Sequence, residues 1–243
     1  LDGEIRGFTS SSELIAVVDL LDRAFENTPR EYFERHIFGD PTLKPEHTRI
    51  YLKNGRVLSS VQIFPRCMCV GNTSVPFGGL GNVATDPTER GRGLAACLML
   101  DAVEWMKNAG FAFSMLSTTI PRYYERFGYR TVHREATIID TIEAMEDPLV
   151  RVADVRRDLD QIKKIYSLYN QDVTGSLIRD DVYWDGQLRF SGEDHANFLV
   201  REIPGQIQGY LRSKVKKGEL LILEFGAIGN YQENFNLLLT SLA

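Results

Sequence analysis

The feature that most restricts the fold is a junction in the first half of the chain, where an apolar strand leads through a turn and a basic glycine loop into a helix. Residues 86 and 87 form the turn, and the loop at 90–93 alternates arginine with glycine. Amide groups at the start of a helix have no partner inside the helix, and the helix dipole favours an anion there. Glycine lets the main chain approach closely, and arginine adds charge-assisted bonds. The junction predicts a pyrophosphate site, with a solvated turn as the alternative.

Motifs and composition narrow the function classes. The sequence contains neither Gly-x-x-x-x-Gly-Lys-[Ser/Thr] nor Gly-x-Gly-x-x-Gly, so P-loop and dinucleotide-binding fingerprints do not compete for this loop. The 243 residues carry a formal net charge of -5, without the basic excess that binding nucleic acid requires. The sequence has no run of about 18 apolar residues and no signal-peptide pattern. We therefore expect no nucleic-acid partner and no membrane span.

The cysteines bear on compartment and metal binding. Cys67, Cys69 and Cys97 fit neither a zinc knuckle nor a Cys-x-x-Cys redox motif. Cys67 and Cys69 alternate with apolar residues, which is typical of small side chains on a strand. Three cysteines without a pairing pattern indicate a reducing compartment. We expect a cytoplasmic protein without a metal.

Hydrophobic periodicity predicts a mixed order of helices and strands in the first part of the chain. Residues 13–25 have apolar side chains at helical spacing behind a serine cluster suited to capping. Asn54-Gly55 marks a tight hairpin between two strand-like runs. A helix starts at Leu94 and stops at Gly110. The predicted strands are 48–52, 56–64, 67–70, 77–85, 111–116 and 129–139, and a short helix is predicted at 122–127.

The order of elements starts again after residue 148. A strand at 151–155, a helix at 158–169 and strands at 198–202, 206–215 and 220–227 follow. We expect two domains, at 1–147 and 148–243, related by a faint internal repeat, and two unrelated mixed domains are the alternative. The second domain has no basic glycine loop, so no phosphate site is expected there. The chain ends at Ala243 inside an apolar helical run, which predicts a fragment with a truncated second domain.

Two short motifs resemble the GCN5-related N-acetyltransferase (GNAT) family. Residues 90–95, Arg-Gly-Arg-Gly-Leu-Ala, match the family's [Arg/Gln]-x-x-Gly-x-[Gly/Ala] loop, and 83–87 resemble its fourth strand. Residues 123–129, Tyr-Tyr-Glu-Arg-Phe-Gly-Tyr, look like its Tyr-Glu-[Lys/Arg]-x-Gly-[Phe/Tyr] element. The resemblance covers residues 5–139. The motif-poor copy after it is similar to the tandem arrangement of the enhanced intracellular survival (Eis) class.

The resemblance implies a fold, a co-substrate and a set of binding residues. The fold is α/β (α+β mixed), a GNAT fold with a mostly antiparallel twisted sheet flanked by helices, followed by a second, partial GNAT-like domain. The co-substrate is acetyl-CoA. Its pantetheine arm would bond to the backbone of Val83, Ala84 and Thr85. Its pyrophosphate would be held by Arg90, Gly91, Arg92, Gly93, Leu94, Ala95 and Ala96.

The resemblance also implies a catalytic tyrosine. Tyr124 matches the residue that donates a proton to the departing CoA thiolate in many members, and a packing role is the alternative. Thr119, in the loop after the fifth strand, is expected near the cofactor or as an ordinary loop residue.

No general base stands in a motif position. Asp86 and Glu89 lie near the loop but suit a turn and a helix start. The resembling Eis class can use its own terminal carboxylate, contributed by a further domain that is not visible here. Deprotonation by water or by missing residues therefore stays open. The four histidines have no catalytic partners at a recognisable spacing. They are His36, His47, His133 and His195.

The leading hypothesis is an enzyme that transfers acetyl from acetyl-CoA to a primary amine of a small molecule or peptide. A catalytically weak or inactive acyl-CoA-binding sensor or scaffold is the main alternative, and Tyr124 favours the enzyme. A third hypothesis, an interaction protein, requires the arginine-glycine loop to be coincidental. The second domain is expected to close the acceptor side, to form a homo-oligomer contact or only to stabilise the chain.

Overall fold

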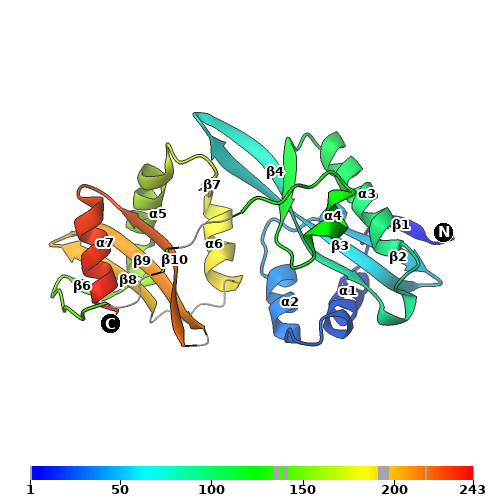
Figure 1. Ribbon diagram of the computed structural model, residues 1–243, viewed down its shortest axis with the longest axis horizontal. Helices are drawn as coiled ribbons and strands as arrows, with labels where there is room; N and C mark the ends of the chain where they lie inside the picture. Colours follow the sequence, from blue (N-terminus) through cyan, green and yellow to red (C-terminus); the bar gives the residue numbers. More distant parts are fainter. Residues whose placement is uncertain (1, 134–136, 139–141, 191–196, 217, 243) are drawn as a thin grey trace. The chain divides into compact units, whose positions relative to one another are not determined.

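The computed structural model describes residues 2–133, 137–138, 142–190, 197–216 and 218–242. The chain forms two compact units, each with its own sheet (Figure 1). The units interleave along the sequence, and the domain division at residue 147 stays a prediction. The first unit comprises Leu1–Met68, Thr73–His133 and Leu177–Ser191, and the second comprises Cys69–Asn72, Arg134–Ser176 and Gly192–Ala243.

The sheet of the first unit has the order β1-β2-β3-β4-β5, and the short β7 adds to β3. The pairs β1/β2, β2/β3 and β3/β7 are antiparallel, whereas β4 and β5 are parallel. The predicted α/β class with a mostly antiparallel sheet is confirmed. The strands are β1 (Glu4–Gly7), β2 (Thr48–Lys53), β3 (Arg56–Val70), β4 (Thr73–Thr85), β5 (Phe113–Leu116) and β7 (Leu177–Ile178).

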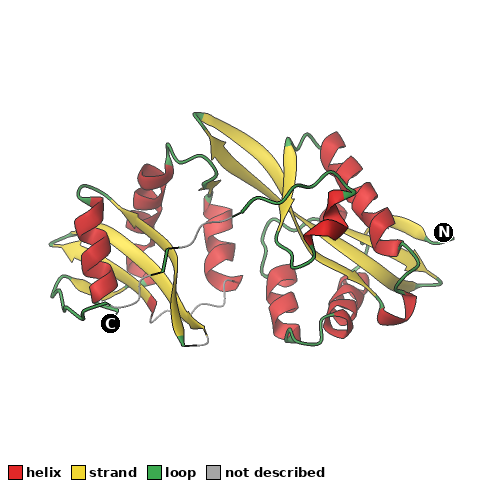
Figure 2. Cartoon of the chain, viewed as in Figure 1, coloured by secondary structure: helices red, strands yellow, loops and turns green. Residues whose placement is uncertain are grey.

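Helices cover both faces of this sheet (Figure 2). The helices α1 and α2 bury apolar residues against one face, where Ile50 and Ala84 belong to their cluster. The helices α3 and α4 cover the other face, in a cluster that includes Val61 and Leu80. The predicted first helix begins after Ser10, whose side chain accepts a hydrogen bond from the amide of Glu13. The helices of this unit are α1 (Ser11–Ala24), α2 (Arg30–Phe38), α3 (Leu94–Asn108), α4 (Pro121–Glu125) and α6 (Asp181–Phe190).

The second unit contains an antiparallel sheet of order β10-β9-β8-β6. Two helices, α5 and α7, pack on β9 and β10. The predicted elements of this half are present, but the strand expected at 151–155 stops at Val152, because Asp154 caps the helix that follows. The elements are β6 (Val150–Val152), α5 (Val155–Asn170), β8 (Phe198–Ile203), β9 (Gln206–Lys216), β10 (Glu219–Ala227) and α7 (Tyr231–Thr240).

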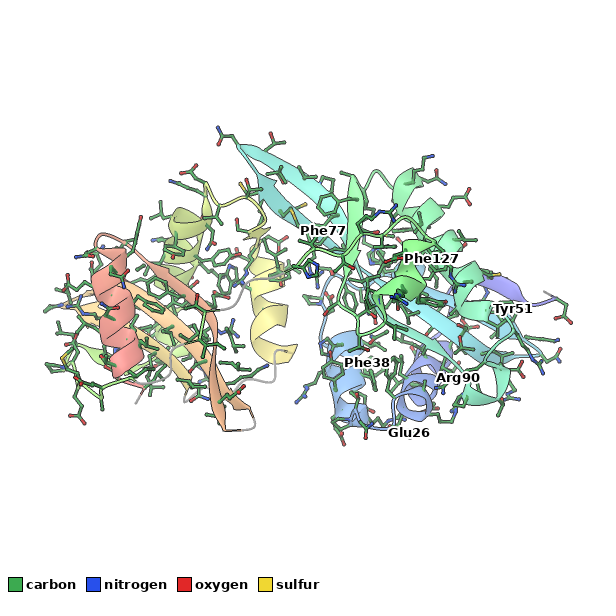
Figure 3. The ribbon with its side chains drawn as sticks, in the orientation of Figure 1. Glu26, Phe38, Tyr51, Phe77, Arg90 and Phe127 are labelled. Atoms are coloured by element: carbon green, nitrogen blue, oxygen red, sulfur yellow. The ribbon has the colours of Figure 1, made fainter. Side chains whose placement is uncertain are left out.

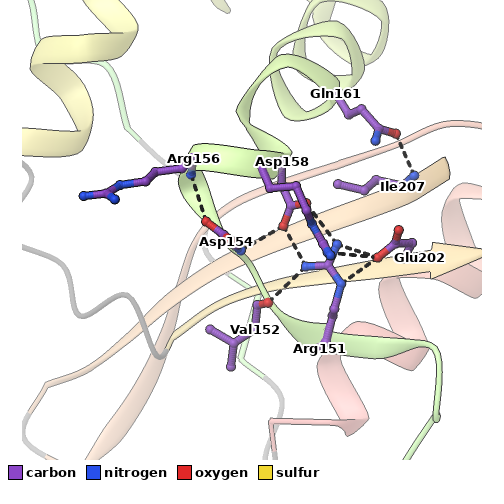
Figure 4. A network of polar contacts seen from close by, with 9 residues as sticks. Arg151, Val152, Asp154, Arg156, Asp158, Gln161, Glu202 and Ile207 are labelled. Atoms are coloured by element: carbon purple, nitrogen blue, oxygen red, sulfur yellow. Dashed lines mark hydrogen bonds and ion pairs between the residues drawn. The ribbon is translucent and has the colours of Figure 1, made fainter. Parts of the chain in front are cut away.

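An ion-pair network around the buried Asp158 ties β6, α5 and β8 together in the second unit (Figure 4). Asp158 is buried, and its carboxylate accepts bonds from Arg151 Nη1 at 2.6 Å, from Arg157 Nε at 2.9 Å and from the amide of Asp154 at 2.8 Å. Arg151 Nε also donates to Glu202 Oε2 at 2.6 Å. Burial by itself raises the pKa of Asp158, but the arginine hydrogen bonds outweigh it and lower the pKa below its ordinary value.

Three more predicted strands require correction. The strand expected at 129–139 is wrong for residues 129–133 and 137–138, which are not in a strand, and the rest of the run lies outside the described residues. Val132 is 86% exposed and Ile138 84%, so this alternation covers no core. The strands expected at 56–64 and 67–70 are one strand, β3. The proline between them lies after the last pair with β2 and before the first pair with β7, where a missing N–H is tolerated.

Candidate functional site

The strands β4 and β5 separate at the end of the sheet. They pair from Phe77↔Phe113 to Leu80↔Leu116, where β5 ends, while β4 continues to Thr85. The last five residues of β4 therefore have no strand partner on the β5 side among the described residues. Backbone groups on such an edge can bond to an extended ligand. The structure places three of the predicted residues on this edge, namely Val83, Ala84 and Thr85.

Asn82 distorts β4 at the point where the two strands separate. Its φ is 51°, in the left-handed region that asparagine tolerates better than most residues. Leu80 and Val83 pack on the α3/α4 face, whereas Ala84 belongs to the α1/α2 cluster. A regular strand would put residues 80 and 83 on opposite faces, so one extra residue is inserted here, as in a β-bulge. Asn82 was not among the residues predicted for the site, although an asparagine next to glycines in a strand is a signal for such a distortion.

The basic loop after β4 leads into an uncapped helix. Gly91 and Gly93 have φ values of 80° and 82°, and a Cβ at either position would meet nothing within 4 Å. Gly93 is the N-cap of α3, makes no side-chain cap bond and is followed by a first turn without an acidic residue. The first amide that bonds within the helix belongs to Cys97, so the amides of residues 94–96 have no backbone acceptor among the described residues and are available. Glycine conformation, open space and available amides all suit a bound anion.

The corresponding helix of the second unit is different. The N-cap of α7 is Asn230, whose side-chain oxygen accepts from the amide of Glu233 at 3.2 Å. The carboxylate of Glu233 in turn accepts from Asn230 Nδ2 at 3.2 Å. This helix start is therefore capped and carries a negative charge, which disfavours a phosphate.

The arginines of the loop are near the surface, and Figure 3 labels Arg90. Arg90 Nη2 donates to the carbonyl oxygen of Ala24 at the end of α1, at 3.1 Å. Arg92 pairs with Glu89 at 2.8 Å, and its side chain is 63% exposed. An exposed pair of this kind contributes little to stability, so the guanidinium group of Arg92 can turn toward a phosphate at small cost.

Asp86 is a structural residue of this loop. It is buried, and its carboxylate accepts from the amide of Thr88 at 3.1 Å and from the Thr88 hydroxyl at 2.7 Å. Arg23 lies 3.3 Å from its other oxygen. The hydrogen bonds from Thr88, with the contribution of Arg23, lower the pKa of Asp86. The acid therefore stays ionised and holds the turn before the basic loop.

Tyr124 lies in the α3/α4 cluster together with Leu80 and Leu94, and Val83 packs against the same cluster. The residue is 8% exposed. Burial, with smaller contributions from neighbouring tyrosines, raises the pKa of Tyr124, and a side-chain hydrogen bond with Thr118 acts in the opposite direction. The phenol keeps its proton at neutral pH and can act as a hydrogen-bond donor. The threonine predicted near the cofactor, Thr119, is exposed, and it is its neighbour Thr118 that contacts the tyrosine.

The aromatic motif around Tyr124 positions its ring. Tyr123 and Tyr129 contact it edge to face, with ring centroids 5.0 and 6.1 Å away. The hydroxyl of Tyr129 bonds to Ser114 Oγ on β5, which ties the segment after α4 to the sheet. Arg126 stacks over the ring of Tyr123 at 4.2 Å. These contacts restrict the orientation of the phenol of Tyr124.

The histidines do not converge on this site. The ring of His47 is buried, accepts from the amide of Lys44 at Nδ1 and contacts the Trp105 ring. His36 Nδ1 lies 2.7 Å from the carbonyl oxygen of Tyr32. His133 is exposed, and His195 lies outside the described residues. Across the described ranges, we find no group of three or more His, Cys, Asp or Glu residues placed to hold a metal ion, and none of the helices has the length and apolar character to cross a membrane.

Comparisons with known proteins agree with this geometry. Residues 4–132, more than half of the chain, match the family model described as an acetyltransferase (GNAT) domain. N-acetyltransferase Eis of Mycobacterium tuberculosis is 27% identical over 126 residues, which cover 47% of this chain and 31% of that protein. An uncharacterized N-acetyltransferase of Streptomyces avermitilis is 24% identical over 211 residues, covering 82% of this chain and 52% of that protein. The chain thus spans about half or less of the length of these curated relatives.

Solved structures share the fold across both units. A probable N-acyltransferase of Enterococcus faecalis V583 aligns with all of this chain and 62% of its own, at a TM-score of 0.75 and 21% identity. Eis1 from Mycobacterium abscessus aligns with 99% of this chain and 62% of its own, at a TM-score of 0.68 and 18% identity. With the strand edge, the uncapped glycine loop and the matched family model taken together, the chain belongs to the GNAT acetyltransferase family and is similar to its Eis-like members.

Proposed function

We propose that this chain binds acetyl-CoA in its first unit and transfers the acetyl group to a primary amine of a small molecule or peptide. The junction between β4 and α3 carries this proposal. The free edge at Val83, Ala84 and Thr85 suits the amide-containing pantetheine arm. The uncapped start of α3 suits the pyrophosphate. The two sites are consecutive in the chain, as one extended ligand requires.

The reaction that we propose is direct attack. The amine nitrogen adds to the thioester carbonyl carbon, and a C–N bond forms. As the tetrahedral intermediate collapses, the C–S bond breaks, and the departing sulfur takes the proton of the Tyr124 hydroxyl. The nitrogen loses one proton over the same cycle, which restores the phenol. The products are the amide and free CoA.

A sensor that binds acyl-CoA without turnover is the second candidate. It is supported by the engagement of the two carboxylates nearest the loop, because Asp86 caps a turn and Glu89 pairs with Arg92. Neither is poised to deprotonate an amine. The two candidates share the cofactor site and differ in turnover, so release of CoA in the presence of an amine separates them.

Replacing Gly93 with aspartate is expected to abolish most acetyl-CoA binding. The change adds a negative charge at the N-cap of α3 and a side chain in the open space beside the loop, where the pyrophosphate would bind. We expect wild type to bind acetyl-CoA and the variant to bind it at least about tenfold more weakly. The aspartate would repel the pyrophosphate, and we expect this to cost more than about 1.4 kcal/mol of binding free energy. Isothermal titration calorimetry measures both affinities.

Gly229→Asp is the matched control. Like Gly93, Gly229 has a positive φ, here 70°, and a Cβ added to it would meet nothing within 4 Å. It also lies just before a helix, but that helix, α7, is capped. The same side chain and the same backbone strain are thus introduced in the second unit. We expect this variant to keep wild-type affinity. Equal binding by wild type and Gly93→Asp would refute the placement of the pyrophosphate.

A further inference from the structure

The distorted segment of β4 is held from β3 by three buried polar side chains, Ser59, Ser60 and Gln62, which we call the polar brace. Each is at most 1% exposed. Polar groups at the centre of a sheet are costly unless they are hydrogen-bonded. These side chains bond to the segment of β4 that passes the end of β5, and not to the regular part of the sheet.

The contacts of the polar brace fall on consecutive parts of that segment. Gln62 Oε1 accepts from Asn82 Nδ2 at 2.5 Å, and Ser60 Oγ donates to the carbonyl oxygen of Asn82 at 3.2 Å. Ser59 Oγ donates to the carbonyl oxygen of Ala84 at 2.6 Å. Asn82 is therefore held at its side chain and at its backbone, while Ala84 is held at its backbone.

Holding Asn82 matters because its backbone is in an unfavourable conformation. A left-handed residue inside a strand persists only where its surroundings impose it. The torsion angles at residue 82 set the direction of the N–H and C=O groups of the residues that follow. The Gln62–Asn82 bond thus bears directly on the strand edge at 83–85.

The presence of glutamine at position 62 is not explained by the stability of the folded chain. Its Nε2 is buried and has no hydrogen-bond partner among the described residues, and the same is true of Thr48 Oγ1, its cross-strand neighbour. A buried donor without an acceptor destabilises the folded state. An apolar residue of similar size would remove that cost, although it would also remove the bond to Asn82. A residue that costs stability and braces a strained segment at a candidate site is best accounted for by function.

We propose that Gln62 is a positioning residue for acyl-CoA: it holds Asn82 in the left-handed conformation that presents the strand edge at 83–85 to the ligand. This inference rests on the proposed acetyl-CoA site. Gln62 acts only through the side chain of Asn82 and does not itself touch the ligand. It follows that removing the Gln62 amide weakens binding only while residue 82 is an asparagine.

A double-mutant cycle tests the proposal with the full chain. Gln62→Leu is expected to weaken acetyl-CoA binding about tenfold or more, because misplaced binding groups are costly. It should change the melting temperature little, because it removes an unpaired buried donor but also takes the acceptor from Asn82 Nδ2. Asn82→Gly keeps access to a positive φ without a side chain. In that background, Gln62→Leu is expected to have no further effect on affinity.

The control is Gln161→Leu in the second unit, where the Gln161 oxygen accepts from the amide of Ile207 at 2.9 Å. This variant loses a satisfied bond, so its melting temperature should fall while its acetyl-CoA affinity stays at the wild-type value. The positioning role is refuted if Gln62→Leu binds like wild type, or if its effect is as large in the Asn82→Gly background. A wild-type protein without measurable acetyl-CoA binding refutes the proposed function instead, and the inference with it.

Discussion

Replacing Tyr124 with phenylalanine is expected to reduce turnover about a hundredfold or more while leaving acetyl-CoA affinity nearly unchanged. The substitution keeps the buried ring and its contacts with Tyr123 and Tyr129, and removes only the hydroxyl. Release of CoA, followed with a thiol reagent, measures the rate. The acceptor comes first from a panel of polyamines, aminoglycosides and lysine peptides.

The pH dependence adds a second measurement. Burial raises the pKa of Tyr124, so the phenol holds its proton up to and beyond its ordinary pKa of about 10. An acid that must be protonated supports the reaction below its pKa and fails above it. The wild-type rate should therefore fall as the pH rises past about 10, and the residual rate of the phenylalanine variant should lack this step.

Tyr123→Phe is the matched control for this prediction. It removes a hydroxyl from the neighbouring residue of the same short helix, α4, and is expected to keep most of the activity. A Tyr124→Phe enzyme as fast as wild type would reduce Tyr124 to a packing residue. An intact wild type that releases no CoA with any amine would favour the sensor.

Replacing Asp158 with alanine is expected to lower the free energy of unfolding of the second unit by about 1–3 kcal/mol, the usual cost of leaving hydrogen-bonding groups without one of their partners. The change removes the acceptor of the Asp154 amide and one of the two carboxylates that Arg151 and Arg157 contact. Both arginines keep their bonds to Glu202. Hydrogen exchange of the α5 and β8 amides measures this unit separately. Both tryptophans, Trp105 and Trp184, lie in the first unit, so their fluorescence would report on the first unit instead.

The same aspartate predicts an acid-dependent stability. The pKa of Asp158 is lower in the folded state than in the unfolded chain, where it is about 3.9. Its contribution to the free energy of unfolding is therefore present above about pH 3.9 and is lost as the pH falls through the folded pKa. The alanine variant should show a smaller loss of stability over that range. Asp160→Ala, at an exposed position of the same helix, should change neither stability nor its pH dependence. Equal exchange rates in Asp158→Ala and wild type would contradict the assigned role.

Elements with a local signal could be predicted from the sequence. The helix α1 has regular apolar spacing behind Ser10, and α3 begins just after the glycine loop and ends before Gly110. The order of strand, loop and helix was enough to indicate the candidate phosphate site, because glycine conformations and free helix amides depend on neighbouring residues only. The helices α2 and α6 gave no such signal, since their sequences mix charged, aromatic and apolar residues.

Features that depend on distant partners were decided only by the tertiary structure. The alternation at 129–139 has the period of a strand, but Val132 and Ile138 are exposed, so a repeating pattern without a surface to cover did not make a strand in the described residues. The free edge of β4 exists because β5, which follows α3 in the chain, ends opposite Leu80. The bond between Gln62 and Asn82 joins residues 20 positions apart on neighbouring strands. Local sequence determined the glycine loop of the proposed phosphate site, and the pairing of strands determined the free edge proposed for the rest of the ligand. The reason is that hydrogen-bond partners across a sheet are set by register and not by sequence proximity.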